Sequence, residues 1–94
     1  MTRDEIVEGL KRQIDEWNAR IAGLEADLEK RKVESRAEAE KSLAEMKRLR
    51  AEAETEIARM RQTSESQWEE TRAKGEAALN DIAEGFRRAW SRVS

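Results

Sequence analysis

Cysteine, histidine, proline and tyrosine are all absent from this chain of 94 residues. The absence of cysteine excludes a disulfide framework. The absence of both cysteine and histidine removes the usual ligands of a zinc site and the usual general base of an enzyme. The sequence also lacks a glycine-rich phosphate-binding loop. We therefore expect no catalytic residues, no metal site and no cofactor.

Long apolar runs are missing as well. Hydrophobic residues make up 37% of the chain and aromatic residues 4%, and the mean hydropathy is −0.99. No apolar stretch follows Met1, so we expect no signal peptide and a cytoplasmic location, and no segment approaches a membrane span. A chain this poor in large apolar side chains usually needs a partner chain for stability.

A large excess of charge of one sign is also lacking, because 19 basic and 21 acidic residues leave a net charge of −2. Nucleic-acid-binding domains normally carry a basic patch. Residues 29–62 are mildly basic, but their positive and negative charges are interleaved, as on the solvated face of a helix. We therefore expect no nucleic-acid partner.

What the chain does contain is helix-forming residues. Charged residues reach 43%, and alanine is the commonest apolar residue. This composition is typical of long helices and coiled coils. It predicts an all-α fold and a single coiled-coil domain over residues 1–94.

The N-terminal third has an unbroken heptad pattern, with apolar residues spaced alternately by three and four positions. We call these seven residues the N-terminal seam: Val7, Leu10, Ile14, Trp17, Ile21, Leu24 and Leu28. A single straight helix cannot bury such a stripe, so we expect the seam to form the interface of a homo-oligomer. Trp17 is bulky for a two-stranded coil, which favours wider or antiparallel packing.

The apolar pattern weakens after the seam without any residue that breaks a helix. An eleven-residue step from Leu28 reaches Ala39, and such a step is three turns of about 3.67 residues each. The stretch "EKRKVESRAEAEK" (29–41) is therefore expected to continue the helix with a weak interface. The stripe then resumes at Leu43, Met46, Arg50, Ala53, Ile57 and Met60. One helix over about 3–62 is predicted.

A cluster of hydroxyl groups in "QTSESQWEE" (62–70) interrupts this background. Ser64 and Ser66 each have Gln or Glu three residues later, which is the capping-box pattern of a helix start. We expect a hinge at about 62–66 and a second helix at about 66–93, folded back as a hairpin; the alternative is one continuous rod-like helix. The residues expected to pack the hairpin are Leu43, Met46, Ile57, Met60, Trp68, Leu79, Ile82, Phe86 and Trp90.

Two blocks resemble a family of small bacterial coiled-coil stress-response proteins. They are "TRDEIVEGLKRQIDEWNARIAGLEA" (2–26) and "SESQWEETRAKGEAALNDIAEGFRRAWSR" (64–92), in which tryptophan and other large residues recur on a charged helical background. The resemblance implies a cytoplasmic helical protein linked to stress and brings no catalytic motif.

Three functional hypotheses follow. The first is a non-enzymatic, homo-oligomeric interaction protein that serves as a scaffold or binder, with itself or another helical protein as partner. The second is a module that binds anionic lipid weakly at a membrane surface, because large apolar residues stand beside arginines near the C-terminus. Its lipid contacts would be Phe86, Arg87, Arg88, Trp90 and Arg92. The third is a disordered hydrophilic protectant, which the clean heptad and the three tryptophans of the chain disfavour.

Overall fold

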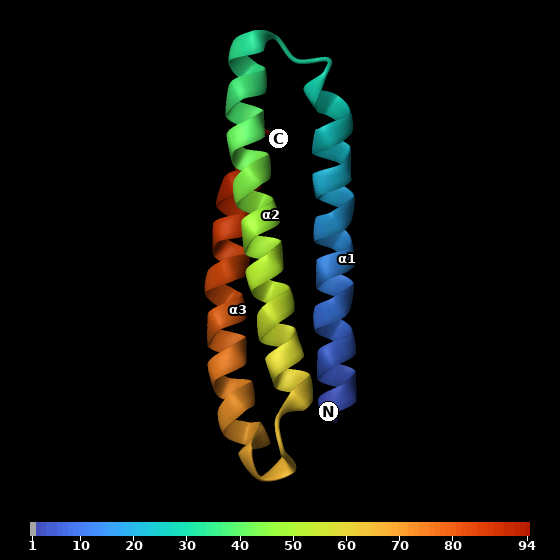
Figure 1. The fold of residues 1–94 in the computed structure, drawn as a ribbon, viewed down its shortest axis with the longest axis vertical. Helices are drawn as coiled ribbons and strands as arrows, with labels where there is room; N and C mark the ends of the chain where they lie inside the picture. The colour runs from blue at the N-terminus through green and yellow to red at the C-terminus, as the bar shows by residue number, and fades with distance from the viewer. Residues whose placement is uncertain (1) are drawn as a thin grey trace.

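The computed structural model, which describes residues 2–94, contains three α-helices that run up, down and up (Figure 1). α1 spans Arg3–Leu28, α2 spans Val33–Gln62, and α3 spans Trp68–Ser91 after a 3-10 turn, η1, at Glu65–Gln67. The Cα atoms fill a body of 53 × 17 × 16 Å. One rod would be roughly 140 Å long at about 1.5 Å per residue. The all-α class and the fold-back near 62–66 are confirmed, and the rod is excluded.

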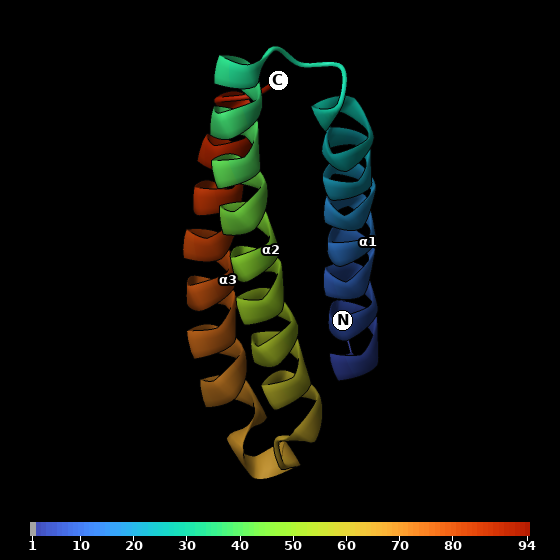
Figure 2. The same ribbon diagram turned by 45° about the horizontal axis from the view of Figure 1, so that its top comes forward.

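α2 lies between the other two helices in both views (Figures 1 and 2). Cα atoms of α2 come within 8 Å of both α1 and α3, whereas no Cα atom of α1 comes this close to α3. Contacts between α1 and α3 are therefore made by long side chains. We call this three-helix arrangement the closed bundle.

The first helix begins at a capping box. The Thr2 hydroxyl accepts a hydrogen bond from the Glu5 amide (3.2 Å), and the Glu5 carboxylate accepts one from the Thr2 amide (3.3 Å). Two amide protons that the helix leaves without a partner are satisfied in this way. The Thr-x-x-Glu spacing at residues 2–5 is a helix-start signal that can be read in the sequence.

The chain turns back at residues 29–32, which corrects the expected continuous helix over 3–62. The Lys30 amide donates to the Asp27 carbonyl (3.0 Å), the Arg31 amide donates to the Leu28 carbonyl (3.2 Å), and Lys32 is extended at φ −65° and ψ 156°. No described residue has a positive φ. Because nothing in this turn requires glycine or proline, no local signal revealed it.

The second turn, at residues 63–67, confirms the predicted hinge but not its capping. Thr63 and Ser64 are both extended, with ψ of 151° and 159°. The side chains of Ser64 and Gln67, which precede η1 and α3, make no capping hydrogen bond, and the Ser66 hydroxyl lies 3.2 Å from that of Ser64. The capping boxes predicted at Ser64 and Ser66 are therefore wrong, and α3 begins at Trp68 rather than at 66.

All three helices contribute one face to a common core. Its buried apolar members are Val7, Ile14, Trp17, Ile21, Leu24, Ala39, Leu43, Met46, Leu49, Ala53, Ile57, Met60, Leu79, Ile82, Phe86 and Ala89. Ser42 is buried with them, and no described buried side-chain nitrogen or oxygen lacks a hydrogen-bond partner. The core runs along the length of the bundle rather than forming a compact centre.

Candidate functional site

The N-terminal seam lies inside the closed bundle. Val7, Ile14, Trp17, Ile21 and Leu24 are buried, and Leu10 and Leu28 pack partly buried against the same core. The prediction of a packed apolar stripe is confirmed. In the closed bundle α2 and α3 of the same chain cover these side chains, and their expected role as the interface of a homo-oligomer stays a prediction.

An aromatic pair joins α1 to α3. The rings of Trp17 and Phe86 stack with centroids 4.4 Å apart and an interplanar angle of 8°. Two large rings fill the space between backbones that do not approach closely, which is the wider packing that the bulk of Trp17 favours. Beside them, the Arg20 guanidinium lies 5.8 Å from the centroid of the half-buried Trp90 ring. This distance is within the range of a cation–π interaction.

The residues expected to pack the hairpin lie in the core or at its edge. Buried among them are Leu43, Met46, Ile57, Met60, Leu79, Ile82 and Phe86, and partly buried are Trp68 and Trp90. The heptad spacing predicts Arg50 on the buried stripe of α2, which is wrong: Leu49 is buried, and Arg50 donates to Asn18 of α1 at 2.8 Å. Because α2 packs against a helix on each side, its buried face is wider than one heptad stripe.

Two glycines mark where α2 and α3 come close together. A Cβ atom at Gly75 would lie 2.7 Å from the sulfur of Met60, and one at Gly85 would lie 3.3 Å from a methyl group of Leu49. At Gly9 and Gly23 no such atom lies within 4 Å. Only Gly75 and Gly85 therefore serve close helix packing.

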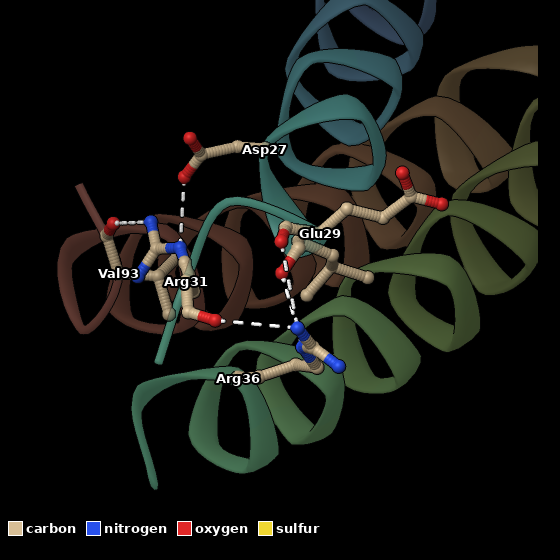
Figure 3. A network of polar contacts seen from close by, with 6 residues as sticks. Asp27, Glu29, Arg31, Arg36 and Val93 are labelled. Atoms are coloured by element: carbon tan, nitrogen blue, oxygen red, sulfur yellow. Dashed lines mark hydrogen bonds and ion pairs between the residues drawn. The ribbon is translucent and has the colours of Figure 1, made fainter. Parts of the chain in front are cut away.

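Two arginines hold the turn between α1 and α2 (Figure 3). Arg36 donates to three carbonyl oxygens at the end of α1 and in the turn: Leu28 (3.2 Å), Glu29 (3.4 Å) and Arg31 (3.3 Å). Arg31 donates to the Asp27 carboxylate (2.8 Å) and to the Val93 carbonyl (2.7 Å). The carbonyls at the end of α1 receive no hydrogen bond from a further helical turn, so Arg36 acts as a C-terminal cap, and Arg31 ties the turn to Val93 near the C-terminus.

A single arginine holds the opposite end of the bundle. Arg3 of α1 donates to the carbonyl oxygen of Thr63, and its guanidinium lies 5.8 Å from the centroid of the Trp68 ring. The Thr63 and Thr71 hydroxyls lie 2.9 Å apart across the same turn. Each end of α1 is thus tied to a turn or terminus by arginine side chains.

The closed bundle does not offer the apolar anchor expected for lipid. Phe86 is 0% exposed and stacks on Trp17, and Trp90 is partly buried. Arg87, Arg88 and Arg92 are exposed. Phe86 therefore cannot touch a membrane surface while the bundle is closed, which corrects its expected role in lipid contact. Among the described helices, none combines the length and apolar character needed to cross a membrane.

Two clefts lie along α1. The apolar cleft between α1 and α3, floored by Ile14, Trp17 and Ile57, has a volume of about 180 Å³. Small-molecule sites are usually about 300–1,000 Å³. A larger groove between α1 and α2 is lined mainly by charged side chains. Within residues 2–94, no group of three or more acidic side chains could hold a metal ion.

The hydrogen bond to the Glu76 carboxylate raises the pKa of the Arg72 guanidinium above its ordinary value. Arginine is already fully protonated at physiological pH. This change therefore provides neither an acid nor a base.

Comparison with models of protein families, with curated proteins and with solved structures finds no match to this chain. The two candidate functional features are accordingly defined by geometry alone. They are the N-terminal seam, covered by α2 and α3, and the turn at residues 29–32 with its arginine cap.

Proposed function

We propose that this chain is a non-enzymatic helical interaction protein that associates with itself and serves as a scaffold or binder. The N-terminal seam carries the proposal, because its apolar positions follow a strict heptad without interruption. This pattern is typical of a helix that pairs with other helices over its whole length. A link to stress and a cytoplasmic location rest on the family resemblance described above.

The surface of the closed bundle limits how this association takes place. Val33 is the only large apolar residue that is strongly exposed within residues 2–94, at 78%. The rest of the exposed surface is dominated by charged residues, many of them in ion pairs such as Arg48 with Glu52 (2.9 Å) and Lys74 with Glu70 (3.0 Å). Exposed ion pairs contribute about 0–1 kcal/mol each, so this surface offers little to a tight interface.

Sedimentation equilibrium over concentrations from about 1 μM to 1 mM tests the proposal. We expect a reversible increase in mean mass with concentration. A mass that stays at 10.9 kDa across the range, at physiological salt and after warming and cooling, would reject self-association. Circular dichroism at each concentration separates association of folded chains from aggregation of unfolded ones.

A further inference from the structure

The connection between α1 and α2 begins with helical backbone angles and consists entirely of residues that favour helix. Glu29 has φ −66° and ψ −22°, which are helical values, and the next two amides donate to carbonyls three residues earlier. Lys32 has a helical φ of −65° and departs only in ψ, at 156°. The residues of this turn are Glu, Lys, Arg and Lys, all good helix formers. Rotation of a few backbone angles would therefore make residues 3–62 one helix.

Such a straightened helix would carry a single apolar stripe. The step of eleven residues from Leu28 to Ala39 keeps the seam of α1 and the inner face of α2 on the same side. The helix would be about 90 Å long at about 1.5 Å per residue. Its apolar face would have lost the cover that α1 and α2 provide for each other in the closed bundle.

A second straightened copy restores that cover without any new contact. α1 runs antiparallel to α2 in the closed bundle (Figure 1). Two straightened helices can therefore lie antiparallel, each α1 packing against α2 and α3 of the other copy as it does now against its own. The contacts are the same and only the chain that supplies α1 changes, which is the arrangement of a domain-swapped dimer with two-fold symmetry.

We infer that this chain associates with a second copy of itself by exchange of α1, with residues 29–32 as the hinge. This inference rests on the proposed self-association and names its route. The observation that favours exchange over docking of closed bundles is the burial of the seam. Val33 is the only large apolar residue that is strongly exposed within residues 2–94, whereas most of the seam is buried, so exchange of α1 gives a dimer more apolar contact than docking of closed surfaces does.

Hydrogen bonds from two arginines oppose the exchange of α1. The three hydrogen bonds from Arg36 to the carbonyls of Leu28, Glu29 and Arg31 hold the turn, as does the bond from Arg31 to Val93. In a continuous helix the carbonyls of Leu28, Glu29 and Arg31 would accept from backbone amides four residues later. Loss of the Arg36 side chain therefore weakens the closed turn and leaves the straight helix intact.

The substitution Val33→Pro distinguishes the closed bundle from the exchanged dimer, because it should disfavour only the straightened helix. Val33 is the first residue of α2, where proline is well tolerated, and the preceding Lys32 already has the extended conformation that a proline requires of its neighbour. In a straightened helix the same proline would be internal and would reduce helix formation on the order of 100-fold at each of two sites. Val33→Ala removes the same exposed side chain without barring a helix and is the matched control.

We expect the parent and Val33→Ala to form the dimer, Val33→Pro to remain monomeric with an unchanged helical spectrum, and Arg36→Ala to raise the dimer fraction several-fold. Adding Val33→Pro to Arg36→Ala should abolish this rise. Arg48→Ala is the control for Arg36, because Arg48 lies on the same helix and pairs only with Glu45 and Glu52.

A cross-link shows directly which chain supplies α1, even if a proline variant fails to fold. Lys47 and Glu25 form an ion pair of 3.1 Å between α2 and α1, and the chain has no native cysteine. In Glu25→Cys/Lys47→Cys, a short bis-maleimide should join two chains in the dimer fraction and one chain to itself in the monomer fraction.

Covalent dimers on a denaturing gel support exchange. A dimer linked only within each chain, or one that persists in Val33→Pro, overturns exchange but leaves self-association standing. Absence of any dimer in both the parent and Arg36→Ala overturns both.

Discussion

Trp17 of α1 and Phe86 of α3 stack at 4.4 Å between ring centroids, although the Cα atoms of their two helices stay more than 8 Å apart. The pair closes the widest side of the bundle. Both side chains are at most 4% exposed, so they contribute apolar burial as well as ring contact. The integrity of the closed bundle should therefore depend strongly on these two residues.

Truncation of either ring tests this dependence. Phe86→Ala and Trp17→Ala should each lower the free energy of unfolding by about 3–5 kcal/mol, because a large cavity replaces a buried ring. The double variant should lose less than the sum, since each ring is the other's partner. Urea denaturation followed by circular dichroism measures these values. Trp90→Ala is the control, with a smaller expected loss because Trp90 is only partly buried; equal losses at all three positions would argue against the stack as the main α1–α3 contact.

A second prediction concerns helix starts. Thr2→Ala should lower stability by about 1 kcal/mol, because Thr2 caps α1. Ser66→Ala should change stability by no more than about 0.5 kcal/mol, since Ser66 is exposed and caps no helix. Thermal melts of both variants measure the difference. A loss at Ser66 that matches the loss at Thr2 would restore the capping role that the sequence suggested for the serine.

The third prediction concerns the arginine at the end of the bundle near the second turn. Arg3→Ala should lower stability by about 1 kcal/mol, because a hydrogen bond to Thr63 and a cation–π contact with Trp68 are both lost. Arg3→Lys should recover part of the loss, since lysine keeps the charge near the ring. Arg12→Ala, at an exposed position of the same helix, is the control. If Arg3→Ala and Arg12→Ala have the same melting temperature, the contacts of Arg3 do not stabilise the turn.

The fourth prediction compares two glycines within helices. Gly23→Ala should raise stability by about 0.5–1 kcal/mol, because alanine favours helix and nothing lies within 4 Å of the new methyl group. Gly75→Ala should be less stable than Gly23→Ala by at least roughly 1 kcal/mol, since its methyl group would lie 2.7 Å from the buried Met60 sulfur. Chemical denaturation measures the free energy of unfolding of both variants. If it rises equally in both, the Met60 side chain can move aside without a loss of stability.

Much of the fold follows from spacing in the sequence. The seven members of the N-terminal seam are buried or partly buried as the heptad predicts, and the hydroxyl cluster at 63–66 coincides with a turn. The burial of Leu49 is not predicted by a single heptad stripe on α2. A helix that packs on two sides buries a wider face, and this width depends on how many neighbours a helix has.

The sequence by itself determined that the chain is helical and which face of α1 turns inward, and it favoured a fold-back after Gln62 over a continuous rod. Only the tertiary structure decided that it also folds back after Leu28, and that the seam is covered by the chain's own helices. The reason is one of magnitude. Helix propensities differ by tenths of a kcal/mol per residue, so four helix formers resist a turn only weakly. Burial of a large apolar side chain stabilises the folded chain by about 1.5–3 kcal/mol. Several side chains of the seam are buried in this way when α1 packs against α2 and α3.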